Sequence, residues 1–125
     1  MAAAVLYHSG ELGERKPMSD ASRVAALKDI LNANPEDAFA RYALGLEYAG
    51  AGELEAALAE FQQLLAAHPD YTNGYFMAAQ VLDRAGRLDE AKTMLASGIE
   101  SARKANNRHA LSEMQAMLEE LELRA

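Results

Sequence analysis

Apolar residues recur along the chain at the spacing of amphipathic helices, and glycine and proline residues divide them into short segments. Glycine ends a helix readily because it adopts the left-handed conformation, and a proline bars the residue before it from a helix. Gly50-Ala51-Gly52 and Gly86 each separate two such segments. The pattern therefore predicts two helical hairpins, built from residues 38–49, 53–67, 71–84 and 87 to about 104.

Two further helices flank these hairpins. Residues 20–35 resemble the second half of a hairpin, since Leu27 and Pro35 stand where that half would place them, although Arg23 replaces a small residue. Residues 106–123 carry a single apolar stripe opposite an acidic and polar face, which is typical of a helix that ends an array. The stripe consists of Leu111, Met114, Leu118 and Leu121. We therefore expect six helices.

The hairpins repeat with a period of 34 residues, a length that by itself indicates a repeat architecture. The matched pairs are Pro35 and Pro69, Gly52 and Gly86, Ala57 and Ala91, and Phe61 and Leu95. Small residues stand where antiparallel helices must approach closely, and larger ones fill the space beside them. The small set is Gly45, Ala57, Ala79 and Ala91, and the large set is Tyr48, Phe61, Leu82 and Leu95.

The first hairpin resembles the tetratricopeptide repeat, in its short bacterial form. It reads Arg41-x2-Leu44-Gly45-x2-Tyr48, then Ala57-x3-Phe61, then Pro69, and the second hairpin follows it more loosely. The resemblance covers about residues 20–123. It implies an all-α, right-handed α–α superhelix of about two and a half repeats plus a C-terminal capping helix.

The second hairpin departs from the repeat at Arg103, where the family has proline. Without that proline, the preceding helix can run on. The stripe of the last helix matches the first helix of a repeat only after a slip of about three residues. We therefore expect the helix that begins at residue 87 to be lengthened.

Residues 1–17 lack a helical period, and Met18-Ser19-Asp20 resembles the start of a capped helix. We interpret residues 1–17 as a flexible N-terminal extension and residues 18–125 as the repeat domain. No apolar run approaches the length of about 20 residues that crosses a bilayer. A secretory signal requires basic residues before its apolar segment, and none precedes the short apolar patch at the N-terminus. We expect a soluble, cytoplasmic protein that does not bind membranes.

Composition and charge exclude several functions. The chain has no cysteine, which removes disulfides, thiolate metal sites and thiol nucleophiles. A net charge of −7 argues against nucleic acid as a partner. The histidines His8, His68 and His109 lie in separate segments, and the paired carboxylates are adjacent rather than facing. No phosphate-binding glycine motif is present. We expect no catalytic site, no metal site and no cofactor.

The resemblance implies that the first helix of each hairpin lines a concave groove. Phe39, Tyr42 and Leu46 project from the side opposite Leu44 and Tyr48, which are expected to face the partner helix. The groove would be completed by Asn73, Phe76, Gln80, Asp83 and Arg84 from the second hairpin and by His109, Ser112 and Ala116 from the last helix. Some members of the family hold the C-terminal carboxylate of a partner with Lys and Asn on these helices. The comparable positions here hold Tyr42, Leu46, Phe76 and Gln80, so we do not expect that clamp.

Two interpretations of the aromatic residues remain open. The groove can bind a peptide or helix of another protein without catalysis, with the aromatic residues as anchors. Alternatively, Phe39, Tyr42 and Phe76 pack against neighbouring helices. A second function is a structural subunit that forms a homodimer or larger assembly through the groove or the open N-terminal edge, where Val5-Leu6-Tyr7 could also dock.

Overall fold

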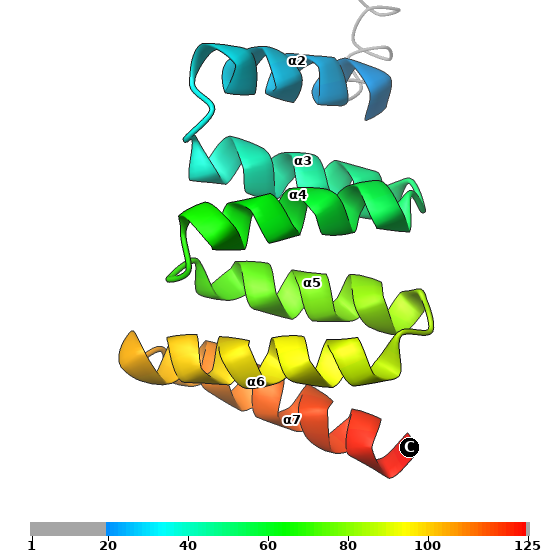
Figure 1. Cartoon of the computed structure of the whole chain (residues 1–125), viewed down its shortest axis with the longest axis vertical. Helices are drawn as coiled ribbons and strands as arrows, with labels where there is room; N and C mark the ends of the chain where they lie inside the picture. The colour runs from blue at the N-terminus through cyan, green and yellow to red at the C-terminus, as the bar shows by residue number, and fades with distance from the viewer. Residues whose placement is uncertain (1–19, 125) are drawn as a thin grey trace, which may run out of the picture.

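The computed structural model describes residues 20–124. The expected extension, residues 1–17, lies outside the described residues, as does the proposed docking segment Val5-Leu6-Tyr7. Over the described range the chain forms six helices and no strand, stacked side by side as successive antiparallel elements (Figure 1). They are α2 (Asp20–Ala33), α3 (Ala38–Gly50), α4 (Leu54–Ala67), α5 (Thr72–Arg84), α6 (Leu88–Lys104) and α7 (Arg108–Arg124). The predicted all-α array is confirmed.

The turns within the hairpins depend on glycine. Gly52 and Gly86 have φ angles of 80° and 77°, in the left-handed region that side chains disfavour. The amide that follows each glycine then bonds back to the preceding helix, and Glu53 N–H donates to the Tyr48 carbonyl at 2.9 Å. This bond satisfies a carbonyl at the helix end, as in a Schellman motif. The glycines therefore fix where α3 and α5 stop.

The connection from α6 to α7 uses the same turn with asparagine in place of glycine. Asn106 has a φ of 57°, and the next amide, of Asn107, donates to the Ala102 carbonyl at 2.9 Å. Helix α6 has 17 residues where α4 has 14, which confirms the expected lengthening. Helix α7 begins two residues later than a 34-residue period from α5 would place it, rather than about three.

Asn106 provides a local test of this turn. We expect Asn106→Ala to lower the free energy of unfolding by about 1 kcal/mol, because the left-handed conformation disfavours a Cβ and asparagine tolerates it better than alanine. Asn106→Gly should leave stability unchanged or slightly higher. Thermal unfolding of the two variants checks this, and equal losses for both would show that the backbone conformation is not the cause.

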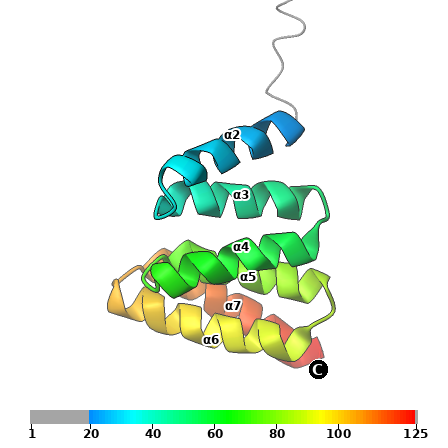
Figure 2. The ribbon, with the colours of Figure 1, turned by 45° about the horizontal axis from the view of Figure 1, so that its top comes forward.

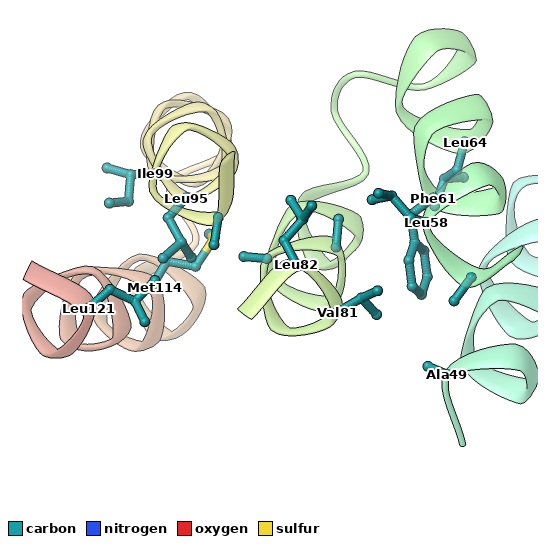
Figure 3. Close-up of a cluster of buried hydrophobic side chains, with 14 of the residues drawn as sticks. Ala49, Leu58, Phe61, Leu64, Val81, Leu82, Leu95, Ile99, Met114 and Leu121 are labelled. Carbon is teal, nitrogen blue, oxygen red and sulfur yellow. The ribbon is translucent and has the colours of Figure 1, made fainter. Parts of the chain in front are cut away.

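The main core runs from α3 to α7 through the interfaces of the hairpins. Figure 3 shows Leu95 of α6 facing Met114 and Leu121 of α7, while Phe61 of α4 points toward α3. These side chains are fully buried, as are Ala57, Ala78, Ala79 and Ala91. The small residues thus lie at the helix contacts, as the sequence predicts.

Gly45 allows one of the close helix contacts. A Cβ built on Gly45 would lie 2.6 Å from the ring of Phe61, well inside van der Waals contact. The missing side chain of α3 is therefore the space that the aromatic ring of α4 fills. This pairing explains the combination of a glycine in the first helix and an aromatic residue in the second.

Helix α2 packs on α3 alone, as the half repeat predicts (Figures 1 and 2). Its contact forms a second apolar cluster, in which Leu31 of α2 meets Ala40 and Leu44 of α3. Arg23, the departure from the small-residue pattern, pairs with Glu47 at 2.8 Å instead of closing a tight helix crossing. The residue mismatch is thus accommodated by an ion pair between the two helices.

Candidate interaction groove

Helix α3 is apolar on both faces because it has neighbours on both. Leu44 was expected to face the partner helix α4, but it packs against α2. Tyr42, on the other side, lies 6.1 Å from the ring of Phe61 and 5.2 Å from the ring of Tyr71. Burial and the nearby Tyr71 raise the pKa of the Tyr42 hydroxyl. Tyr42 and the half-buried Leu46 therefore contribute to the core as well as to the surface.

Phe39 differs from its neighbours because its side chain is not covered. It is 70% exposed, although phenylalanine is usually buried. It begins the same face of α3 that carries Tyr42 one turn later. Packing against neighbouring helices thus covers most of the Tyr42 side chain. The Phe39 side chain is left available for contact with another molecule.

Helix α5 contacts both α3 and α7. Helices α3 and α5 are the first helices of the two hairpins, and α7 is the cap. A hollow of about 540 Å³ lies between α5 and α7. It is lined by Phe76, Gln80 and Asp83 of α5 and by Ala116, Met117 and Glu120 of α7. We call this hollow the α5–α7 groove, and its size is that of sites which bind small ligands or a few side chains.

The two arginines beside the α5–α7 groove are both engaged. Arg84, at the end of α5, donates to the Ala49 carbonyl at 3.0 Å and so joins α5 to the end of α3. Arg124, in the last turn of α7, pairs with Asp83 at 2.9 Å. The hydrogen bond to Asp83 raises the pKa of Arg124 above its ordinary value.

The remaining predicted residues lie outside the α5–α7 groove. Asn73 and Ser112 are exposed on α5 and α7, and His109 is 85% exposed beside Glu113, at 3.5 Å. The structure therefore brings together four of the predicted positions, namely Phe76, Gln80 and Asp83 of α5 and Ala116 of α7.

Sequence reasoning missed three residues of α7 at this site, namely Met117, Glu120 and Arg124. They follow Ala116 at helical spacing, so they share its side of α7. The signal was present, but the register of α7 depends on the two-residue shift in the α6–α7 turn, which only the structure resolves.

The other side of the array carries a smaller hollow. It has a volume of about 320 Å³ between α4 and α6 and includes Gln62, Thr93 and Met94. Within residues 20–124 there is no group of three or more histidine or acidic side chains placed to hold a metal ion. None of the helices described is both long and apolar enough to span a bilayer.

Two family models match the chain, and both describe the tetratricopeptide repeat. One matches residues 48–118 and the other residues 18–76. Together they cover the half repeat, both hairpins and most of the last helix. No curated protein matches the chain.

Solved structures show the same fold. A tetratricopeptide repeat domain protein from Salinibacter ruber is 37% identical, has a TM-score of 0.68, and is matched over 71% of this chain and 90% of its own. PcrH, in complex with the chaperone-binding region of PopD, is 20% identical with a TM-score of 0.79 over 98% of this chain and 89% of its own. The TPR2B domain of yeast Sti1, in a complex with pHsp70, is 17% identical with a TM-score of 0.77 over 82% of each.

Proposed function

The chain belongs to the tetratricopeptide repeat family, and on this premise we propose that it is a non-catalytic interaction module. Its target is a peptide or helix of another protein, bound along the face formed by α3, α5 and α7. Phe39 and Phe76 anchor this segment, and the polar side chains of the α5–α7 groove orient it.

The exposure of Phe39 carries this proposal. A phenylalanine that is 70% exposed next to half-buried aromatic residues leaves apolar area that a partner can bury. The α5–α7 groove adds three apolar lining residues, Phe76, Ala116 and Met117. Apolar anchors surrounded by a few polar groups are typical of peptide-binding sites.

Two structures of the same fold support the binding of a protein segment. PcrH binds a region of PopD, and the Sti1 domain was solved in a complex with pHsp70. Their sequence identity to this chain is low, so they support the general mode of action rather than a particular partner.

Affinity capture from a lysate of the source organism tests the proposal. We expect the double variant Phe39→Ala/Phe76→Ala to retain its partner about tenfold less well, because aromatic anchors dominate such interfaces. The matched control is Ile30→Ala/Leu123→Ala, which removes two exposed apolar side chains from α2 and from the end of α7. Equal capture by both variants and by the unaltered chain would contradict the proposal.

The rival function is self-assembly through the open edge at α2, where Ile30 is 44% exposed. Sedimentation equilibrium of the same variants separates the two functions. Peptide binding predicts an unchanged mass for all of them. An unaltered chain that is dimeric, and becomes monomeric in Ile30→Ala/Leu123→Ala, would favour assembly at that edge instead.

A further inference from the structure

The α5–α7 groove is lined by both apolar and acidic residues. Phe76, Ala116 and Met117 are the apolar lining residues, while Asp83 and Glu120 supply a carboxylate from each helix. No cationic side chain lines the groove itself. Two carboxylates beside an apolar surface favour a ligand that carries a positive charge next to an apolar group.

A cation of the chain already occupies one of these carboxylates. Arg124 pairs with Asp83 at 2.9 Å, and the negative charge of Glu120, one turn before Arg124 on α7, also contributes to the raised pKa of Arg124. The Arg124 side chain is 51% exposed, so water reaches the pair and its contribution to stability is small. A weak, exposed pair of this kind can be exchanged for a cation from a partner.

The second arginine does not neutralise the groove. Arg84 follows Asp83 directly, but its guanidinium bonds to the Ala49 carbonyl at the end of α3. That carbonyl is at the negative end of a helix, where a cation is stabilised. Arg84 is thus held toward α3, and the side of the groove formed by Asp83 and Glu120 stays acidic.

We propose that the α5–α7 groove selects a partner segment in which a Lys or Arg side chain stands next to an apolar one. Asp83 and Glu120 receive the cation, the apolar lining residues receive its neighbour, and Arg124 is the internal competitor that the partner displaces. The inference rests on the proposed function and specifies the chemistry of the partner. A second copy of this chain fits poorly, because its net charge of −7 matches that of the groove in sign.

A random-peptide library tests the inference without assuming a partner. Dodecamers displayed on phage are selected against the full-length chain and against Asp83→Asn/Glu120→Gln. The matched control, Asp29→Asn/Glu36→Gln, changes the same two residue types at exposed positions on α2 and in the turn after it. Selected peptides are then synthesised, and their affinities are measured by fluorescence polarisation at physiological salt, with Phe76→Ala as a further variant.

We expect Lys or Arg beside an apolar residue to be enriched by the unaltered chain and by the control, but not by Asp83→Asn/Glu120→Gln. That variant should bind the selected peptides about tenfold more weakly, since a charge-assisted contact is lost. Arg124→Gln should bind them about threefold more tightly, because the competitor is gone. If Arg124 had only a structural role, its removal would not increase the affinity for these peptides.

The failures of the two proposals are distinct. Peptides that depend on Phe76 but carry no excess of basic residues would overturn the charge inference and leave the interaction function intact. Equal weakening by the groove pair and the control pair would show attraction to overall charge and would also overturn the inference. If no selected peptide depends on Phe76, both proposals are contradicted.

Discussion

Phe61→Ala is expected to destabilise the chain by about 3–5 kcal/mol, the range for removing a fully buried aromatic side chain. Phe61 has no exposed surface, and its ring fills the space that Gly45 leaves on α3. Removing the ring opens a cavity between α3 and α4 and takes away one of the two ring contacts of Tyr42. Small domains have only about 5–15 kcal/mol of stability, so this loss is a large fraction of the total. Chemical denaturation measures it.

Phe39→Ala is the matched control for this loss. It makes the same substitution on the neighbouring helix at a side chain that is 70% exposed. We expect its free energy of unfolding to stay within about 0.5 kcal/mol of the unaltered chain. Similar losses for the two variants would mean that Phe61 is not the centre of the first hairpin.

Met114→Ala is expected to lower the free energy of unfolding by about 2–5 kcal/mol. Met114 is fully buried at the contact of α7 with α6, where a Cβ on Gly98 would come within 2.5 Å of its sulfur. Met114 and Leu121 are the large side chains of the cap helix that are fully buried in the core (Figure 3). We therefore expect faster hydrogen exchange along α7 as well as a lower melting temperature.

Met117→Ala separates the stability of the cap from the function of the groove. It removes the same side chain three residues later on α7, at a partly exposed position in the α5–α7 groove. Its effect on stability should be less than half that of Met114→Ala, while its effect on peptide binding should be larger. A larger loss of stability for Met117→Ala than for Met114→Ala would show that the register of α7 described here is wrong.

The fold was predictable because its signals are local and repeated. Gly52, Gly86 and Pro69 mark helix ends through backbone conformation alone, and the pairing of Gly45 with Phe61 follows from size. The end of α6 was predicted from the lack of a proline at Arg103. The exact register of α7 was not, because it depends on Asn106 adopting a left-handed conformation that the sequence permits but does not require.

The site was predictable only in part. The 34-residue period placed Phe76, Gln80 and Asp83 on one face of α5, and the structure brings them together. Which aromatic residues of α3 stay exposed depends on neighbours distant in sequence. Tyr71, at the start of α5, covers one side of Tyr42, and no residue covers Phe39 to the same extent. Glu120 of the acidic pair was missed, although it lies one turn after the predicted Ala116 on α7 and shares its side of the helix.

The most direct test of the proposed interaction face is a nuclear magnetic resonance titration of the isotope-labelled full-length chain with a peptide selected on it. We expect the largest amide shifts at the start of α3 around Phe39 and along the α5–α7 groove, from Phe76 to Asp83 and around Met117. Shifts concentrated instead at Gln62, Thr93 and Met94, between α4 and α6, would contradict the account.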